Sequence, residues 1–183
     1  LAATSRINPL TYDADPSLRT LIDIAPFGIS NAPAEQTRHA IKGGVPGIAL
    51  DQVIIWGGGV YNWFDPLTLI HAVARLVEQH PKLRLYFLGV KPPNPQVPAM
   101  RMAAETMRLS EELGLTGTHV FFNTDWVDYE DRVNYLLDAD LGVSTHFEHV
   151  ETAFSFRTRI LDYLWAGLPI VATDGDTFAE LIR

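Results

Sequence analysis

The sequence predicts an α/β domain: a Rossmann-like, three-layer arrangement in which helices cover both faces of a mostly parallel sheet. Short apolar runs alternate with amphipathic helical patterns along the chain, which is typical of parallel strands joined by crossover helices. The length of 183 residues is enough for one large core and too short for two full domains. We expect residues 1–17 to be a polar entry segment and residues 18–183 to form one domain, truncated at both ends.

Five apolar runs are predicted to form the sheet. Each is rich in β-branched, aromatic or leucine side chains and is bounded by turn residues or by a helical pattern. The predicted strands are Val53–Trp56, Leu83–Gly89, His119–Phe122, Leu141–Ser144 and Leu168–Ala172.

The predicted helices are recognised mainly by their ends. Asp65 is a good N-cap, and Pro66 stands at the first helical position, where its missing N–H costs nothing. Gly114 and Gly167 occupy positions just past the ends of two later helices. The predicted helices are Pro33–Lys42, Pro66–His80, Met100–Leu113, Tyr129–Leu137, Phe156–Ala166 and one that begins at Thr177.

Composition excludes several classes of function. The chain has no cysteine, which rules out disulfides, thiolate metal sites and a cysteine nucleophile, and fits a cytoplasmic location. The formal net charge of −8 argues against binding to a nucleic-acid duplex. No apolar run approaches the roughly 20 residues that a membrane span needs, and no signal-peptide pattern is present.

The glycine run after the first predicted strand lies where a ligand is expected. In open parallel sheets, ligands bind outside the carboxyl ends of the strands. Gly57-Gly58-Gly59 would let the backbone approach such a ligand closely. The run matches neither the dinucleotide fingerprint nor a P-loop, which argues against a dehydrogenase. A tight turn without a ligand is the alternative interpretation.

The helix predicted at Phe156–Ala166 has an unusual charge pattern. With Ser155 as N-cap, Arg157 and Arg159 fall in the first turn, where the helix dipole disfavours cations. An anion at that end would reverse the penalty, because backbone N–H groups and two guanidinium groups would converge on it, and a diphosphate is the natural candidate. Asp162, among apolar neighbours, would suit a ribose diol. The alternative is an ordinary Arg159–Asp162 ion pair with Arg157 in solvent.

The sequence from Asp162 to Thr173, Asp-Tyr-Leu-Trp-Ala-Gly-Leu-Pro-Ile-Val-Ala-Thr, resembles the Glu-Ala-apolar-Ala-x-Gly-x-Pro-Val-Val-Ala-Thr signature of family 4 (group 1) retaining glycosyltransferases of the GT-B fold. Weaker similarities to that family lie at Pro26–Ile29, which is similar to the turn that opens the domain, and at Asp138–Ser144, which is similar to an Ala-Asp strand. The chain thus looks like a divergent form of the C-terminal, nucleotide-sugar-binding half of a GT-B enzyme.

The resemblance implies a transferase that takes a sugar from a nucleotide-diphosphate donor, with retention of anomeric configuration and without a metal cofactor. It implies diphosphate contacts from Gly57, Gly58, Gly59, Arg157 and Arg159 and a ribose contact from Asp162. The acceptor, a sugar, a lipid or another small molecule, would be held by an N-terminal domain, so no catalytic residue is assigned in this chain. The resemblance leaves peripheral membrane association of the full-length protein open.

The chain departs from the family pattern at two places. The family has a second glutamate eight residues before the ribose-binding acid, and this position is Phe154 here, so Glu148 and Glu151 become the candidates for sugar binding. The loop after the first strand usually supplies an Arg and a Lys, but neither occurs between residues 42 and 75. The arginines of the later helix, with Lys91 as a further candidate, must then meet the phosphate charge. A non-catalytic nucleotide-binding or scaffold domain of the same fold is the alternative function.

The remaining residues considered for the site are aromatic residues and histidines. The family places the base near the loop after the third strand, so Trp126 and Val127 are candidate base-binding residues. Trp63 and Phe64 are predicted to be buried packing at the entrance of a helix. The run His146–His149 contains two histidines around Glu148, but it lies on a loop without helical ligand spacing, so no metal site is predicted.

Overall fold

The computed structural model describes residues 4–91, 94, 96–98 and 100–182. Within these residues, five parallel strands form one sheet in the order β3-β2-β1-β4-β5. The strands are β1 (Gln52–Gly59), β2 (Leu83–Gly89), β3 (Val120–Phe122), β4 (Leu141–Ser144) and β5 (Ile170–Ala172). The predicted parallel sheet is confirmed, and the predicted strands differ from the observed ones only at their ends.

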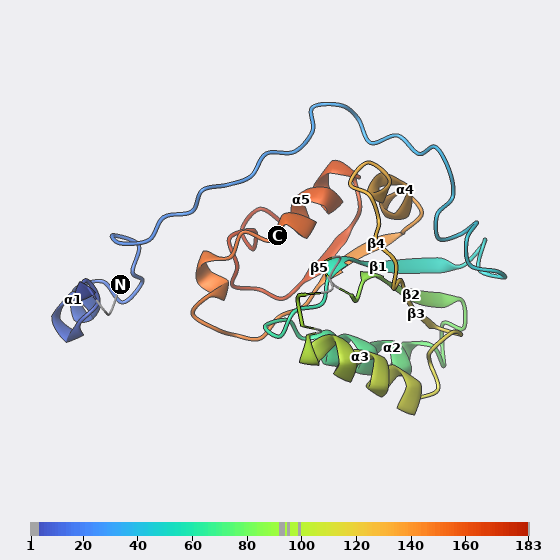
Figure 1. The fold of residues 1–183 in the computed structure, drawn as a ribbon, viewed down its shortest axis with the longest axis horizontal. Coiled ribbons are helices and arrows are strands. Elements are labelled where there is room, and N and C mark those ends of the chain that lie inside the picture. The colour runs from blue at the N-terminus through green and yellow to red at the C-terminus, as the bar shows by residue number, and fades with distance from the viewer. Residues whose placement is uncertain (1–3, 92–93, 95, 99, 183) are drawn as a thin grey trace.

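Helices cover both faces of the sheet, as the three-layer prediction requires. In Figure 1, α2 (Pro66–Leu76) and α3 (Arg101–Glu112) lie on one face, and α4 (Arg132–Leu136) and α5 (Thr158–Trp165) lie on the other. The predicted start of α2 is confirmed, because the Asp65 carboxylate accepts a hydrogen bond from the backbone N–H of Thr68 at 3.1 Å.

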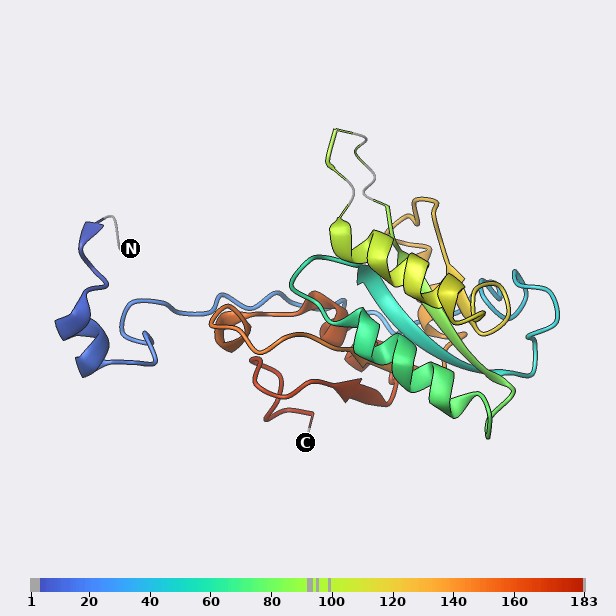
Figure 2. The ribbon, with the colours of Figure 1, turned by 90° about the horizontal axis from the view of Figure 1, so that it is seen from below.

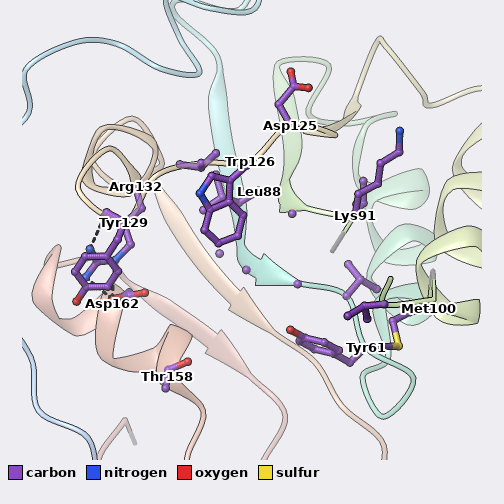
Figure 3. Close-up of a pocket in the computed structure, with 18 of the residues that line it drawn as sticks. Tyr61, Leu88, Lys91, Met100, Asp125, Trp126, Tyr129, Arg132, Thr158 and Asp162 are labelled. Atoms are coloured by element: carbon purple, nitrogen blue, oxygen red, sulfur yellow. Dashed lines mark hydrogen bonds and ion pairs between the residues drawn. The ribbon is translucent and has the colours of Figure 1, made fainter. Parts of the chain in front are cut away.

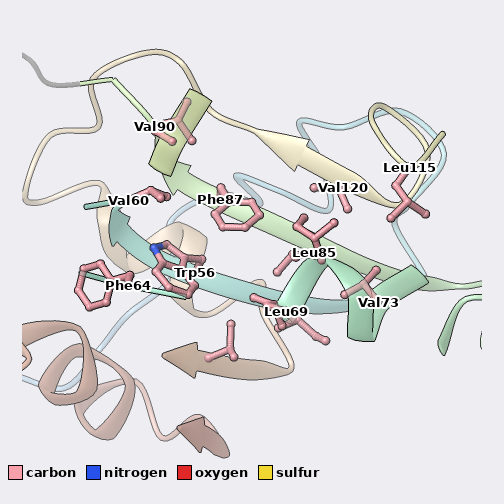
Figure 4. Close-up of a cluster of buried hydrophobic side chains, with 14 of the residues drawn as sticks. Trp56, Val60, Phe64, Leu69, Val73, Leu85, Phe87, Val90, Leu115 and Val120 are labelled. Carbon is pink, nitrogen blue, oxygen red and sulfur yellow. The ribbon is translucent and has the colours of Figure 1, made fainter. Parts of the chain in front are cut away.

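The core consists of two apolar clusters separated by the sheet. Alternate residues of β1 point to opposite faces, so that Ile54 and Trp56 pack toward α2 and α3 while Val53 and Ile55 pack toward α4 and α5. Figure 4 shows the first cluster, in which Trp56 lies among the apolar residues of β2 and α2. Strands buried on both faces have near-continuous apolar sequences, which is why the strands were recognisable.

The leading segment behaves differently from the rest of the chain. The helix α1 (Pro9–Ala14) stands apart from the sheet and its helices, and the following residues run across the α5 side to the start of β1 (Figures 1 and 2). The helix predicted at Pro33–Lys42 is wrong, because this stretch consists of bends and turns. Its backbone N–H groups bind side chains instead: those of Thr37 and Arg38 bind Asn134, and those of 41–42 bind Asp138.

The three predicted helices nearest the C-terminus differ from the observed structure. The helix predicted at Tyr129–Leu137 is the shorter α4, and the one at Phe156–Ala166 is α5, which begins at Thr158. Ser155 is not its N-cap, since Arg157 holds that position and the Ser155 hydroxyl donates to the Glu151 carbonyl at 2.9 Å. The described residues 177–182 form turns rather than the predicted helix, and Arg183 lies outside the described residues.

The strand order creates a switch point between β1 and β4. The chain builds outward from β1 through β2 to β3, and then crosses to the other side of β1 for β4 and β5. Tyr163 of α5 holds this junction, because its hydroxyl donates toward the carbonyls of Ile55 and Val143 at 3.1 and 2.9 Å. A crevice at the carboxyl edge near such a switch point is the usual ligand position in open α/β sheets.

Candidate functional site

A cavity of about 580 Å³ opens at the carboxyl edge of the sheet. Its wall is formed by the end of β1 (57–61), the end of β2 (88–91), the loop after β3 (125–127), Arg132 of α4, and Thr158 and Asp162 of α5. Figure 3 shows Asp162, Arg132 and Tyr129 grouped at one end, with Tyr61, Met100 and Lys91 toward the other. The cavity therefore joins the glycine loop, the loop after β3 and Asp162, as the sequence led us to expect.

The glycine loop requires glycine for reasons of space. A Cβ at residue 57 would lie 2.9 Å from the Tyr163 ring, and one at residue 59 would lie 2.9 Å from the ring of Tyr61. Gly58 has φ +134°, a backbone conformation that other residues rarely adopt. The Gly57 N–H donates to the Tyr163 hydroxyl at 2.8 Å. The loop is thus held from below by Tyr163 and presents bare backbone to the cavity.

Arg159 lies behind the glycine loop rather than in the cavity. Its side chain is buried, and its Nη2 donates to the Gly59 carbonyl at 2.8 Å. The guanidinium stacks between aromatic rings, 4.4 Å from the centroid of Trp56 and 4.2 Å from that of Phe64. Burial lowers the pKa of Arg159 to about 10, so the group stays cationic at neutral pH. Its Nη1 has no hydrogen-bond partner among the described residues.

Arg157 is also buried and also lies outside the wall of the cavity. Its Nη2 is 3.4 Å from the Glu151 carboxylate, and its Nε is 3.6 Å from the buried carboxylate of Asp176. The alternative with Arg157 in solvent and Arg159 paired to Asp162 is therefore wrong. Of the two arginines, Arg157 is the one balanced by carboxylates, whereas the interactions of Arg159 are with a carbonyl and aromatic rings.

Asp162 is paired with an arginine that sequence reasoning missed. The Nε and Nη2 of Arg132 donate to one carboxylate oxygen, Oδ1, at 3.3 and 3.2 Å. Arg132 also stacks on Tyr129, with 3.4 Å between its guanidinium carbon and the ring centroid. The available signal was position, because Arg132 is the first residue of α4, directly after the loop that follows β3. All three side chains line the cavity.

The candidate base-binding residues both line the cavity. Trp126 is 67% exposed, and in Figure 3 its indole projects toward the end of β1. Val127 lies beside it, and Lys91 contributes an ammonium group from the end of β2. An exposed indole in a hollow at the edge of a sheet offers a flat surface on which a planar ring can stack.

The two candidate sugar-binding glutamates lie on the loop after β4, outside the wall of the cavity. Glu148 is exposed, while Glu151 accepts hydrogen bonds from Ser155 and Arg157. Within the described residues, no group of three or more histidine and carboxylate side chains is arranged to hold a metal ion.

A second cavity of about 320 Å³ adjoins the first. The two share Tyr129, Arg132, Thr158 and Asp162, and the outer wall of the second is the 27–30 segment. This segment overlaps Pro26–Ile29, the stretch whose sequence is similar to the turn that opens the family's domain. The Arg132–Asp162 pair therefore stands between two connected hollows.

One family model matches most of this chain. The model of the family "Glycosyl transferases group 1" matches residues 51–183. A search of curated protein sequences found no significant match. Within the described residues, we find no helix with the length and apolar character needed to cross a membrane.

Several solved structures share the fold. The C-terminal domain of LpcC from Francisella tularensis, a group 1 glycosyl transferase, is 14% identical with a TM-score of 0.61, covering 84% of this chain and 75% of that one. HepE of Anabaena in complex with UDP-glucose is 21% identical with a TM-score of 0.59, covering 75% and 34%. A trehalose-6-phosphate structure from E. coli bound with UDP-2-fluoro glucose is 16% identical with a TM-score of 0.52, covering 76% and 32%.

The chain spans about a third of the length of HepE, and more of the isolated C-terminal domain of LpcC. At these identities the neighbours establish the fold, which is the Rossmann-like half of the GT-B arrangement. The family match covers the whole sheet, the glycine loop and α5. With the parallel sheet and its cavity, this match makes the chain a member of the group 1 glycosyltransferase family.

Proposed function

We propose that this chain is the donor-binding half of a glycosyltransferase, which holds a nucleotide-diphosphate sugar while an acceptor is presented by another domain. Support comes from membership of the group 1 family and from neighbours solved with UDP-glucose and UDP-2-fluoro glucose. The resemblance to family 4 favours retention of the anomeric configuration. The residues that hold the donor are proposed from the contacts that follow.

One observation carries the proposal: a buried arginine that has no carboxylate partner among the described residues lies directly behind a glycine loop that lines a cavity. A Cβ at Gly58 would be 3.8 Å from Nη2 of Arg159, so the guanidinium lies close to the backbone of the loop that lines the cavity. A buried charge without a counter-ion is costly. A bound diphosphate would supply the missing negative charge, which explains why the cation is kept there.

The α5 terminus adds to this positive end of the cavity. Among the described residues, no side chain caps the first N–H groups of α5, and Thr158 at that terminus lines the cavity. Uncapped N–H groups and the helix dipole both favour an anion. Arg157 lies next to Arg159 and adds a second positive charge, which nearby carboxylates partly neutralise.

We infer that the nucleoside lies at the other end of the cavity. Asp162 would accept hydrogen bonds from the ribose hydroxyls, since Arg132 occupies only Oδ1 of its carboxylate. Trp126 and Val127 would flank the base. Glu148 and Glu151 remain the candidates for contacts with the transferred sugar, on the loop after β4 beyond the diphosphate end.

The chemical task of this half is electrostatic. When the bond between sugar and diphosphate breaks, negative charge grows on the leaving diphosphate. Fixed donors aimed at that charge stabilise the transition state more than the ground state. Arg159, the backbone of the glycine loop and the α5 terminus would supply them without a metal ion.

Calorimetric titration of the chain with UDP, GDP and dTDP, with uridine, guanosine and thymidine as the uncharged comparisons, tests the proposal. We expect one diphosphate to bind saturably and its free nucleoside to bind at least about tenfold more weakly, because the diphosphate supplies charged contacts. Asp162→Ala should weaken binding by a similar factor, and Glu112→Ala, an exposed carboxylate on α3, should leave it unchanged. Equal binding of diphosphate and nucleoside would contradict the phosphate site.

The alternative is a scaffold domain that kept the fold without donor binding, and the missing first-loop cations favour it. The titrations separate the two functions, because a scaffold would bind none of the three diphosphates in the full-length protein. We also expect the isolated chain to catalyse no transfer. Full turnover by this chain alone would overturn the assignment of the acceptor to another domain.

A further inference from the structure

Two aromatic side chains beside the glycine loop are stacked and half exposed. The rings of Tyr61 and Trp63 lie 4.8 Å apart between centroids and are almost parallel, at 3°. Tyr61 is 40% exposed and Trp63 is 47% exposed, whereas Phe64 next to them is buried at 5%. The prediction that Trp63 and Phe64 are both buried packing is therefore correct for Phe64 and wrong for Trp63.

The stacked pair begins in the cavity and continues outside it. Tyr61 lines the cavity and lies against Gly59, where a Cβ would meet its ring at 2.9 Å. Trp63 is not part of the cavity wall. Since one face of the indole rests on Tyr61, its exposed area belongs to the other face and the edges. The pair thus forms a flat aromatic surface at the rim, on the side of the glycine loop.

The loop that carries this surface is fixed to the loop after β4. Phe64 forms an isolated antiparallel bridge with His146, and the Asp65 N–H donates to the Thr145 carbonyl at 3.0 Å. The Thr145 hydroxyl donates to the Asp65 carbonyl at 2.6 Å. The exposed Glu148 is two residues beyond His146. The aromatic surface and an exposed carboxylate therefore lie on two bridged loops, above the switch point between β1 and β4.

We propose that Tyr61 and Trp63 are a stacking platform for a pyranose ring of a carbohydrate acceptor, an inference that rests on the proposed donor site. If the diphosphate lies at the glycine loop, the donor's anomeric carbon lies beyond it, at the rim. The acceptor must approach that carbon from outside the cavity, and the platform is the surface it meets there.

The chemistry of the platform fits a sugar better than a lipid chain. A pyranose ring has an apolar C–H face that packs on a flat aromatic ring, and hydroxyls at its edge that need polar partners. The Tyr61 hydroxyl and the neighbouring loop with Glu148 offer such partners. A stacked aromatic pair gives a large contact area at low cost in conformational entropy. A lipid chain would gain nothing from the planarity or from the carboxylate.

Saturation-transfer NMR on the chain tests the platform. The probes are the methyl glycosides of glucose, galactose, mannose and N-acetylglucosamine, each measured with and without UDP. We expect transfer to the ring C–H protons of at least one glycoside, a loss of at least about fivefold in Trp63→Ala, and partial recovery in Trp63→Phe because an aromatic face is restored. Tyr12→Ala, which removes an exposed aromatic ring from α1, away from both cavities, is the control and should retain the signal.

The outcomes separate the platform from the donor site. The platform is overturned if none of the four glycosides gives a saturation-transfer signal. It is also overturned if the signal is unchanged in Trp63→Ala. UDP titrations of Trp63→Ala run alongside: unchanged nucleotide affinity with lost glycoside transfer is the expected pair of results. Nucleotide binding without glycoside transfer would leave the donor site standing and remove the platform. A saturation-transfer signal on a glycoside without nucleotide binding would support the platform and remove the donor site.

Discussion

Two buried polar clusters of this molecule differ in how completely their groups are satisfied. Asp138, whose side chain is 1% exposed, accepts four hydrogen bonds: from Gln36 and His39 on Oδ1, and from the N–H groups of Ile41 and Lys42 on Oδ2. In the arginine cluster, which comprises Arg157, Arg159 and Asp176, each residue has a buried polar atom without a hydrogen-bond partner among the described residues.

The difference indicates what each cluster is for. Buried polar groups in folded proteins are nearly always hydrogen-bonded. A buried carboxylate whose oxygens both accept hydrogen bonds therefore has a structural role. Asp138 fastens the irregular 36–42 segment to the sheet. Unpaired buried polar groups lower stability and persist mainly where function needs them. Arg159 lies behind the proposed diphosphate site, so the ligand would supply the negative charge that this arginine lacks, whereas the unpaired atoms of Arg157 and Asp176 lie 3.6 Å from each other.

Removing the saturated carboxylate should have the largest effect on the molecule. Asp138→Ala leaves the buried N–H of Ile41 and the N–H of Lys42 without a partner, so we expect a loss of about 3 kcal/mol in the free energy of unfolding. Urea denaturation followed by circular dichroism measures it. Glu112→Gln, in an exposed ion pair on α3, should change stability by less than about 0.5 kcal/mol. Equal effects of the two substitutions would break the comparison.

Replacing Arg159 should affect nucleotide affinity more than the free energy of unfolding. Arg159→Met keeps the bulk between Trp56 and Phe64, and Gly59 O still accepts from the Trp56 indole at 3.2 Å. We expect the free energy of unfolding to stay within about 1 kcal/mol of wild type or to rise. Affinity for the preferred nucleoside diphosphate should fall by about 10- to 100-fold, since the positive charge behind the glycine loop is lost.

Calorimetry and urea denaturation of the same samples measure both quantities. Arg108→Met, an exposed arginine of α3, is the control and should change neither. A large loss of stability in Arg159→Met with little change in affinity would make Arg159 a structural residue and contradict the proposed site.

A smaller effect is expected at the Arg132–Asp162 pair. Arg132→Gln removes the partner of Asp162 without burying an unpaired group deeply, because both side chains are partly exposed. We expect about a three- to tenfold loss in nucleotide affinity, since the carboxylate is no longer oriented. The preference for UDP over 2′-deoxy-UDP, measured by calorimetry, should shrink as well. An unchanged preference would separate Arg132 from ribose recognition.

The smallest effect concerns pH. Burial alone would raise the pKa of Asp138, but hydrogen bonds from His39, Lys42, Ile41 and Gln36 outweigh it and hold the pKa below its usual range. Stabilisation from a lowered carboxyl pKa is present above the unfolded-state pKa of about 4 and is lost as pH falls through the folded-state pKa.

The test compares wild type with Asp138→Asn. Between about pH 5 and pH 3, the free energy of unfolding of wild type should fall more than that of Asp138→Asn, because only the carboxylate gains a proton there. Urea midpoints at each pH measure the difference between the two proteins. A difference that stays constant or widens toward acid pH would show that the charge of the Asp138 carboxylate does not contribute to the free energy of unfolding.

Sequence periodicity predicted the regular elements best where the local pattern is strong, in strands buried on both faces and in helices with one apolar face. The strands and α2 and α3 were recognisable because apolar spacing and caps such as Asp65-Pro66 are local properties of the chain. The 33–42 segment was not, since its backbone N–H groups bind Asn134 and Asp138 about 100 residues away in sequence. Local propensity carries no information on such distant acceptors.

For the site, the sequence by itself determined which residues are available: the glycine run, a carboxylate one turn into α5, and a supply of arginines in place of the missing first-loop cations. Only the tertiary structure decided how they are used. It put Arg159 behind the glycine loop, paired Asp162 with Arg132 instead, and left Trp63 exposed on Tyr61. The physical reason is that partner choice depends on burial and on strands that meet at the switch point, and both are set by the packing of the whole sheet.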